Sequence, residues 1–335
     1  MGRTWLRRAV TIPGLYLLLG LAVALAPIAL SIALVVDLVR FARSRRPFMA
    51  SRLYVFGCVY LLDEAMGLVA LLAVWIGGGL GAGREARVRR GAYAVQSAWA
   101  QVLFVASRWM LGLRYEVEGE GAAAPGPILV FIQHTSVLDT LIPTCIVARQ
   151  HGLRLRFVLK RELLISPCLD VAGHMLPNVF VDRSGAQTAR EVSRIRALAA
   201  NLSSSEGALI YPEGTRFTPA KLVRAVEKLQ QTDPDLHEQA RGLSHLLPPR
   251  LGGALALLEG APDADCLFIA HHGLEGFEKV EDLWDGGLVG ARVKIRMWRR
   301  ARADVPVGQR ERAKWIYREW QGLDDWLGAV LDRAA

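Results

Sequence analysis

Cysteine is scarce in this sequence, and several common sequence fingerprints are missing from it. The four cysteines, at positions 58, 145, 168 and 266, form no CxxC pair and no zinc-ligand spacing. We therefore predict neither a disulfide framework nor a zinc site. The sequence contains no Gly-Lys dipeptide, no GxSxG and no GxGxxG after a strand pattern. These absences remove the support for a P-loop, a serine-hydrolase elbow or a dinucleotide-binding turn.

Lysine is missing from the first third of the chain, where positive charge is concentrated. Residues 1–114 contain fourteen Arg and no Lys against four acids, a net charge of +10, while the whole 335-residue chain carries +9. A nucleic-acid-binding protein would be expected to carry its basic surface on a folded domain, so we predict no nucleic-acid partner. The arginines flank apolar runs instead, which is typical of contact with anionic lipid head groups.

Two long runs without charge lie in this N-terminal third. The first, Ala9–Val36, includes a 26-residue apolar stretch, and the second, Ala65–Gly83, has 19 residues. A bilayer core needs about 20 apolar helical residues, whereas the apolar part of a signal peptide usually has about 7–15. We therefore predict two hydrophobic membrane helices. An interfacial helix over 92–113, with Trp99 and Trp109 on its apolar side, should follow them. An ordinary helix packed on a sheet is an equal alternative for 92–113.

The arginine clusters leave two membrane topologies open. They lie before, between and after the two runs, and the most basic cluster lies between them. If both runs cross the bilayer, that cluster is on the opposite side from both ends, which the positive-inside rule disfavours. A re-entrant hairpin that dips into one leaflet would keep all three clusters on one face. Labelling of a cysteine at position 45 from the periplasmic side would exclude the hairpin.

Strand-like and helix-like patterns alternate after Arg114. This alternation predicts an α/β fold, a mainly parallel central sheet flanked by helices. About 220 residues suffice for one such domain. We therefore predict a membrane-anchoring helical region over 1–114 and a catalytic domain over 115–335. The clearest strand patterns are Ile128–Gln133, Arg154–Lys160, Gly207–Tyr211, Cys266–Ala270 and Arg292–Trp298.

His134 is the first candidate for chemistry, because it follows the strand pattern Ile128–Gln133 and precedes Asp139 by five residues. Open α/β sheets bind ligands at the carboxyl ends of their strands. If His134 precedes a helix and Asp139 lies in its first turn, the carboxylate can fix the imidazole tautomer. The other ring nitrogen can then accept a proton from a hydroxyl. Ser136 and Asp139 also match a capping box, which explains Asp139 without catalysis, so both interpretations remain open.

Other charged residues follow three further strand patterns. Glu213-Gly214-Thr215-Arg216 comes after Gly207–Tyr211, Lys160 ends Arg154–Lys160, and Arg183 follows a short strand pattern at 179–182. Arginine binds phosphate oxygens bidentately, and glycine lets the backbone approach a ligand. Each feature alone also fits a plain turn or a charged strand end. Together they indicate a site for a phosphorylated polyol.

These segments resemble the lysophospholipid acyltransferase family, especially the 1-acylglycerol-3-phosphate acyltransferases. The resemblance extends over about residues 85–300, and Gln133 stands where the family frequently has Asn. The matching segments are His134–Asp139 for the HxxxxD block, Phe180–Arg183 for the FxxR-type block, Glu213–Arg216 for the EGTR block and Leu247–Arg250 for the proline block.

The resemblance implies a glycerolphosphate-acyltransferase-like fold and an enzyme of phospholipid biosynthesis. Acyl-CoA or acyl carrier protein would donate a fatty acyl group to the free hydroxyl of 1-acyl-glycerol-3-phosphate, without an acyl-enzyme, a cofactor or a metal. His134 would be the general base and Asp139 would orient it. The partners would be the lipid bilayer, a lysophospholipid and the thioester donor. The acceptor-binding residues would be Arg183, Glu213, Gly214, Thr215 and Arg216, with Lys160 as a helper.

Two alternatives and one expectation about location accompany this interpretation. Another lysophospholipid or glycerol 3-phosphate could be the acceptor, because the blocks recognise the shared glycerophosphate. An inactive membrane scaffold with this fold is the alternative from another class, and the presence of His134, Asp139 and Arg216 argues against it. The Arg-rich, Ala- and Gly-rich composition indicates a GC-rich bacterial genome. We therefore predict the bacterial inner membrane, with the catalytic domain on the cytoplasmic side.

Overall fold

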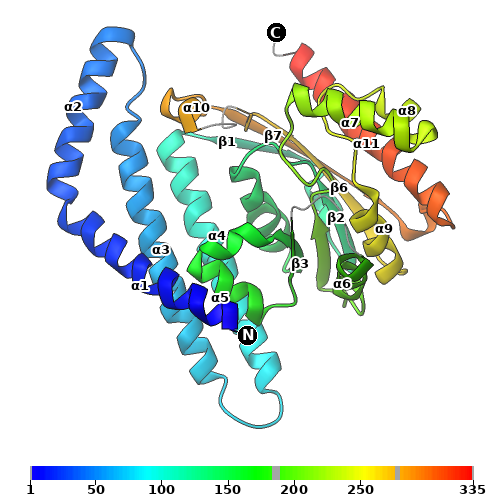
Figure 1. The fold of residues 1–335 in the computed structure, drawn as a ribbon, viewed down its shortest axis with the longest axis horizontal. Coiled ribbons are helices and arrows are strands. Elements are labelled where there is room, and N and C mark those ends of the chain that lie inside the picture. Colours follow the sequence, from blue (N-terminus) through cyan, green and yellow to red (C-terminus); the bar gives the residue numbers. More distant parts are fainter. Residues whose placement is uncertain (1, 183–188, 276–279, 334–335) are drawn as a thin grey trace. The chain divides into compact units, whose positions relative to one another are not determined.

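The computed structural model describes residues 2–182, 189–275 and 280–333, which form two compact units (Figure 1). The predicted division into 1–114 and 115–335 stays a prediction, because the first unit also takes in segments from later in the chain. The first unit comprises the described residues within 1–114, 160–178 and 276–291, and the second those within 115–159, 179–275 and 292–335.

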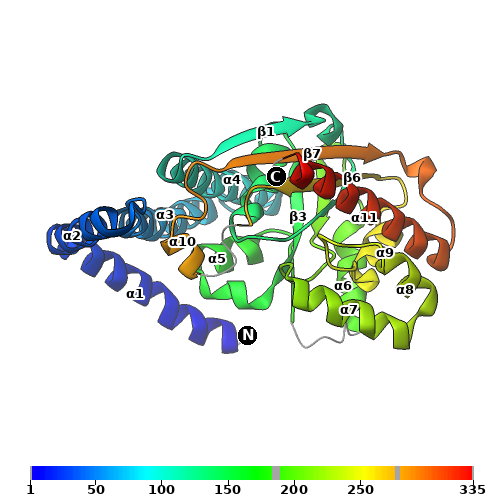
Figure 2. The ribbon, with the colours of Figure 1, turned by 90° about the horizontal axis from the view of Figure 1, so that it is seen from above.

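A seven-stranded sheet lies at the centre of the second unit (Figures 1 and 2). Its strands are β1 (Arg114–Glu118), β2 (Ile128–Ile132), β3 (Arg154–Lys160), β4 (Val179–Val181), β5 (Glu206–Ile210), β6 (Asp265–His272) and β7 (Arg292–Arg300). Their order is β1-β7-β6-β2-β5-β3-β4. β2 pairs in parallel with β5 and β6, and β3 pairs in parallel with β5, whereas β7 is antiparallel to β6. The predicted fold class, a mainly parallel sheet flanked by helices, is confirmed.

One face of the sheet packs against helices α6 (Ala189–Ala199), α9 (Leu251–Gly260) and α11 (Gln309–Asp332) (Figure 2). Neighbouring residues of a strand point to opposite faces, so Phe131 of β2 and Phe268 of β6 share this core. Their rings stack with centroids 5.2 Å apart. All five residues of β2 are buried, which is typical of a strand covered on both faces. Helices α7 (Pro219–Thr232) and α8 (Pro234–Ala240) pack against α11.

The first unit is helical, and its main feature is an antiparallel hairpin of two long helices, α3 and α4 (Figure 1). A core that includes Leu15, Leu68, Leu71, Ala92 and Ala172 joins α1, α3, α4 and α5. Its helices are α1 (Gly2–Ala24), α2 (Ala26–Ser44), α3 (Ala50–Gly77), α4 (Arg84–Leu111), α5 (Pro167–Met175) and α10 (Val280–Trp284), and a 3₁₀ turn, η4 (Arg161–Ile165), precedes α5.

The first apolar run forms two helices, whereas the sequence analysis expected one continuous helix. The chain turns at Leu25, between α1 and α2, and Pro27 lies in the first turn of α2. Proline lacks the N–H that would continue the helical ladder, and its ring clashes with the carbonyl four residues earlier. Pro13 is accommodated inside α1.

The second apolar run also differs from its predicted bounds. The helix begins at Ala50 and ends at Gly77, so Asp63 and Glu64 lie inside it rather than at its entrance. Glu64 is buried and accepts hydrogen bonds from Ser166 Oγ at 2.7 Å and the Cys168 N–H at 3.0 Å. Because protein donors satisfy this carboxylate, an acid can occupy the middle of an otherwise apolar helix.

The aspartate that follows the first run caps the helix that contains the second run. Asp37 of α2 is fully buried and accepts the N–H groups of Met49, Ala50 and Ser51 at 2.8–2.9 Å. The first N–H groups of a helix have no partner within the helix, and a carboxylate both bonds them and complements the helix dipole. The acid that interrupts the apolar character at the end of the first run therefore caps α3.

Among the residues that the structure describes, two helices are long and apolar enough to cross a membrane, Thr4–Ala24 and Ala50–Gly77. They give weak support to the predicted membrane association, and the choice between a spanning and a re-entrant topology stays a prediction. In α4, Leu103 and Phe104 are buried while Val102 and Trp109 are exposed. Trp109, on the apolar side predicted for this helix, is therefore exposed, and the choice between an interfacial helix and an ordinary packed helix stays open.

Several arginines that flank the apolar runs bind acids within the first unit. Asp170 of α5 accepts from Arg7 Nη2 at 2.8 Å and from Arg8 Nε at 3.2 Å. Asp285 forms salt bridges with Arg40 and Arg46. Part of the N-terminal positive charge is thus used inside the protein, and its predicted contact with lipid head groups stays a prediction.

Candidate active site

Three neighbouring parallel strands bring the predicted chemistry to one edge of the sheet. β5 and β6 flank β2 and run in its direction, so the carboxyl ends of all three strands lie together. His134 lies just after β2, Tyr211 directly after β5, and His271 near the end of β6. This edge is where open α/β sheets place their ligands.

His134 and Asp139 form the pair that the sequence predicts. His134 Nδ1 lies 3.0 Å from Asp139 Oδ1 and 3.1 Å from Oδ2. The helix expected after His134 is instead a 3₁₀ turn, Leu138–Leu141, followed by a π-helical turn, Pro143–Ala148. This arrangement turns Asp139 back, so that its Oδ2 accepts the N–H groups of Thr135 and Ser136 at 2.7 and 2.8 Å.

The same carboxylate thus caps the turn and holds the imidazole, so the geometry fits both interpretations of Asp139, and its catalytic role stays a prediction. Burial alone would raise the pKa of Asp139, but the charge and hydrogen bond of His134, with a contribution from His271, hold it well below the ordinary range. An ionised Asp139 accepts the proton on Nδ1 of His134. Nε2 is then left with a lone pair and has no hydrogen-bond partner among the described residues.

The Glu213 side chain is buried next to His134 and does not face solvent. Its side chain is buried, Oε1 accepts the N–H of His134 at 2.9 Å, and Oε2 accepts the N–H of Leu247 at 3.2 Å. Burial raises the pKa of Glu213 to about 8, with smaller contributions from nearby carboxylates. The glutamate of the EGTR block therefore joins three separate chain segments, and its predicted acceptor-binding role stays untested.

Tyr211 packs against the imidazole from the neighbouring strand end. The ring centroids of His134 and Tyr211 are 4.9 Å apart, and the Tyr211 hydroxyl donates to the Asp139 carbonyl at 3.4 Å. Burial, together with nearby Asp139, raises the pKa of Tyr211 well above its ordinary value. The phenol therefore remains neutral and restricts the movement of the His134 ring.

The turn after β5 brings the other EGTR residues beside the proline block. Gly214 has φ +68, and a Cβ there would lie 3.1 Å from Arg250 Nε. Only glycine fits this close approach without strain. Lys221 Nζ donates to the Arg216 carbonyl at 2.8 Å and to Thr215 Oγ1 at 3.3 Å. The turn is thus fixed from both sides, and two basic side chains, Lys221 and Arg250, contact it.

Two predicted acceptor-binding residues are not part of this description. Arg183 lies outside the described residues. Lys160 is the last residue of β3 and belongs to the first unit. Their predicted roles in acceptor binding stay predictions.

The sequence analysis missed one buried group at the site. That group is His271, which directly follows the strand pattern Cys266–Ala270. In the structure it is fully buried, with Nε2 3.6 Å from Asp139 Oδ2. Only the pairing of β6 with β2 reveals this proximity, since the two residues are far apart in sequence. Within the described ranges, no three His, Cys, Asp or Glu side chains gather as metal ligands would.

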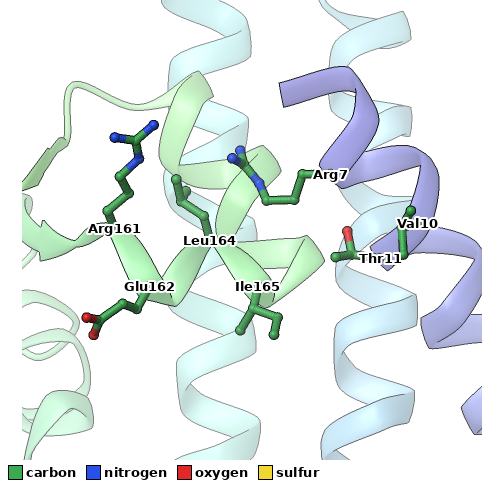
Figure 3. Close-up of a pocket in the computed structure, with 7 residues that line it drawn as sticks. All are labelled: Arg7, Val10, Thr11, Arg161, Glu162, Leu164 and Ile165. Atoms are coloured by element: carbon green, nitrogen blue, oxygen red, sulfur yellow. The ribbon is translucent and has the colours of Figure 1, made fainter. Parts of the chain in front are cut away.

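A separate cavity of about 400 Å³ lies within the first unit (Figure 3). Arg7 and Arg161 point to the same side of it, and Leu164 lies between them. The guanidinium of Arg7 is already bound to Asp170. This cavity holds no His, Cys or Asp and is distinct from the residues around His134. Its lining residues are Arg7, Val10, Thr11, Arg161, Glu162, Leu164 and Ile165.

Comparison with known families agrees with this geometry. Residues 114–246 match the model of the acyltransferase family. The chain carries an acyltransferase domain. The match confirms the acyltransferase family predicted from the sequence, over the segment that contains all eight predicted site residues.

The chain is also similar in fold to a solved enzyme. That structure is the 1-acyl-sn-glycerophosphate (LPA) acyltransferase PlsC from Thermotoga maritima, with a TM-score of 0.51 and 15% sequence identity. The likeness covers 83% of this chain and 98% of that one. At this identity it shows the fold and leaves the substrate open. No curated protein sequence matches the chain.

Proposed function

We propose that the protein transfers a fatty acyl group from acyl-CoA or acyl carrier protein to the free hydroxyl of 1-acyl-glycerol-3-phosphate, producing phosphatidate. The observation that carries the proposal is the His134–Asp139 pair, 3.0 Å apart in a domain of the acyltransferase family, with Nε2 of the imidazole unpartnered within the described part of the chain. A base so arranged needs an acidic proton on its substrate, and an acceptor hydroxyl supplies one.

The mechanism needs only groups of this chain and the two substrates. Nε2 of His134 takes the hydroxyl proton, and the alkoxide oxygen forms a bond to the thioester carbonyl carbon. The tetrahedral intermediate collapses with cleavage of the carbon–sulfur bond, and the proton passes from the imidazolium to the departing thiolate. Asp139 stabilises the imidazolium throughout, because its carboxylate remains ionised beside it. No acyl-enzyme is formed, and a metal or cofactor has no step to perform.

The acceptor proposal is supported by guanidinium groups near the turn after β5. Arg216 belongs to that turn, and Arg250 packs over Gly214 within it. Guanidinium groups bind phosphate oxygens bidentately. We assign Glu213 to positioning His134, since both of its oxygens already accept backbone N–H groups. Arg183, Thr215 and Lys160 are further candidates for acceptor binding.

We propose that the protein acts at a membrane, because both the lysolipid and the acyl chain partition into a bilayer. The helices Thr4–Ala24 and Ala50–Gly77 support this proposal. Both helices carry exposed large apolar side chains, for example Leu17 of the first and Leu72 of the second. Anchoring the enzyme raises the local concentration of both substrates. The bacterial inner membrane, with the catalytic domain on its cytoplasmic side, is the location we propose.

A transfer assay with the detergent-solubilised full chain tests the function. Lysophosphatidate, other lysophospholipids and glycerol 3-phosphate are each combined with acyl-CoA and with acyl carrier protein, and product lipid and free thiol are quantified. We expect phosphatidate and thiol in equal amounts. His134→Ala should lower turnover by about 10²–10⁴-fold, the usual contribution of a general base. Its matched control, His237→Ala on α8, should retain turnover.

Three outcomes would contradict the proposal. Turnover at the wild-type rate in His134→Ala would remove the base assignment. Thiol release without acylated product would indicate hydrolysis of the thioester. The absence of transfer with every acceptor and donor would favour an inactive scaffold with this fold.

A further inference from the structure

A second imidazole lies against the carboxylate of the candidate active site, and the proposed reaction does not use it. His271 is on β6, next to the strand that delivers His134, and its side chain is fully buried. Its Nε2 lies 3.6 Å from Asp139 Oδ2, on the carboxylate oxygen that also accepts the N–H groups of Thr135 and Ser136. Asp139 is therefore approached by one histidine from β2 and another from β6.

Packing alone does not explain an imidazole at this position. Both ring nitrogens of His271 are buried without a hydrogen-bond partner in the described structure. A buried polar group without a partner is costly, and a phenylalanine of similar size would fill the space without that cost. Asp139 is an acceptor close by, and a small approach would bring Nε2 from 3.6 Å into hydrogen-bond range. Catalytic hydrogen bonds are often long in the free enzyme and tighten when substrate binds.

Gln133 fixes the backbone of His271 at this position. Its side-chain Nε2 donates to the His271 carbonyl at 2.7 Å, and its Oε1 accepts the His271 N–H at 3.3 Å. The side-chain amide thus takes the place of a backbone pair where β2 has ended. Gln133 is the residue that departs from the frequent Asn of the family block. An Asn is one methylene shorter, so we attribute this two-point contact to the longer side chain.

We propose that His271 is a positioning residue in the acyl-transfer reaction. Its Nε2–H donates to Asp139 Oδ2 and thereby reduces the electrostatic effect of the Asp139 carboxylate on His134. The inference rests on the proposed function, since it assigns a role within that site. His271 acts through Asp139 and does not touch the reacting atoms.

The effect of removing this donor has a definite direction. Four titratable groups face the carboxylate or its imidazole partner from the packed elements: His134 after β2, Tyr211 and Glu213 after β5, and His271 on β6. Glu275 follows β6 and interacts electrostatically with His271. Tyr211 remains neutral near pH 7, as described above.

Loss of the His271 donor leaves more of the negative charge of Asp139 to interact with His134. The imidazolium is then favoured, and a base that holds its proton more tightly is inactive up to a higher pH.

The test compares four variants on β6 in the full-length protein. His271→Phe and His271→Asn remove the donor, since an Asn amide reaches only as far as Nδ1 of the imidazole. His271→Gln keeps it, because the Gln amide nitrogen reaches the position of the imidazole Nε2. His272→Phe is the matched control on the adjacent residue, which is partly exposed and lies 3.4 Å from Glu275. For each, we measure kcat, KM for both substrates and the pH dependence of kcat/KM.

We expect His271→Phe and His271→Asn to lower kcat by about 10–100-fold. This is the usual range when a hydrogen-bond partner that orients a group in direct contact with the reacting centre is lost. The acidic limb of the pH profile should move to higher pH, with little change in KM. His271→Gln should restore both, and His272→Phe should change neither. A uniform loss of kcat without a shift of the limb would overturn the inference. Equal damage from Gln and Phe, or wild-type behaviour of His271→Phe, would do so as well.

A second readout separates this inference from the proposed function. The ring titration of His134, followed by NMR in wild type, His271→Asn and His271→Gln, needs no substrate. We expect the titration to move upward in the Asn variant and to return in the Gln variant; an unmoved titration in the Asn variant overturns the inference. Absence of acyl transfer in the wild type, with the titration shift present, would instead remove the proposed function.

Discussion

Asp139 in the second unit and Asp170 in the first are both fully buried, and each has a histidine Nδ1 at 3.0 Å. They differ in what else binds the carboxylate. Asp170 also accepts from the guanidinium groups of Arg7 and Arg8. Asp139 accepts the N–H groups of Thr135 and Ser136, and within the described structure no guanidinium bonds it. The two pairs share this Nδ1–carboxylate distance, but Nδ1 of His174 lies closer, at 2.7 Å, to the Asp170 backbone carbonyl, and the two carboxylates have different electrostatic surroundings.

The difference shows what makes an Asp–His pair suitable for proton transfer. An arginine guanidinium is always charged at accessible pH, so two of them neutralise Asp170 permanently. Burial would raise the pKa of Asp170, but hydrogen bonds and charge from Arg7 and Arg8 lower it. Little negative charge remains there to stabilise an imidazolium on His174. Asp139 is bound by neutral N–H groups and by imidazoles, whose protons can move, so its charge remains available to His134.

The largest expected effect is on catalysis, and it follows from removing the charge of Asp139. Asp139→Asn should lower kcat by about 10²–10⁴-fold, because the imidazole loses the charge that fixes its tautomer and stabilises its protonated form. His174→Ala removes the corresponding imidazole of the first unit and should leave kcat unchanged. Steady-state kinetics on both variants checks this. Equal losses in the two would show that the surroundings of the carboxylates do not distinguish them.

On the Asp170 side the expected effect is on stability. Asp170→Asn leaves Arg7 and Arg8 without their acid, and breaking a buried pair typically costs about 3–5 kcal/mol. The arginine side chains are 24% and 23% exposed, so water offsets part of this and we expect about 3 kcal/mol. Chemical unfolding in detergent measures the change. Asp285→Asn is the control, since its side chain is 48% exposed and such pairs contribute about 0–1 kcal/mol. Similar losses in both variants would contradict the expectation.

The His134–Asp139 pair could be predicted from sequence because its signals are local. A buried strand ends at Ile132, and the next seven residues include both partners, so the strand pattern and the spacing suffice. The parallel sheet was predictable for the same reason, since apolar runs alternate with helical periodicity. The turn at Leu25 has a visible cause in Pro27, but the length of the apolar run outweighed it in the sequence analysis.

The rest of the site depends on strand order, which no local pattern contains. His271 approaches Asp139 because β6 lies beside β2, although 132 residues separate the two in sequence. Glu213 accepts the His134 N–H because β5 lies on the other side of β2. The family block identifies Glu213 as a site residue, but only the packing shows that its carboxylate bonds the backbone. Asp37 likewise caps α3 through a turn of the chain that the apolar pattern does not reveal.

The last expected effect is the smallest when counted per pH unit, and it sharpens a second contrast, between the two carboxylates that bond His134. Burial raises the pKa of Glu213 to about 8 from an ordinary 4.5, whereas that of Asp139 is lowered. From about pH 4.5 to 8 the folded chain therefore holds a proton on Glu213 that the unfolded chain releases. Stability should fall as pH rises through this window, by up to about 1.4 kcal/mol per pH unit, and then level off. Glu213→Gln cannot ionise, so the wild-type-minus-variant difference in unfolding free energy should slope downward from pH 5 to 8. A difference that stays flat would mean that Glu213 is ionised in the folded protein, as Asp139 is.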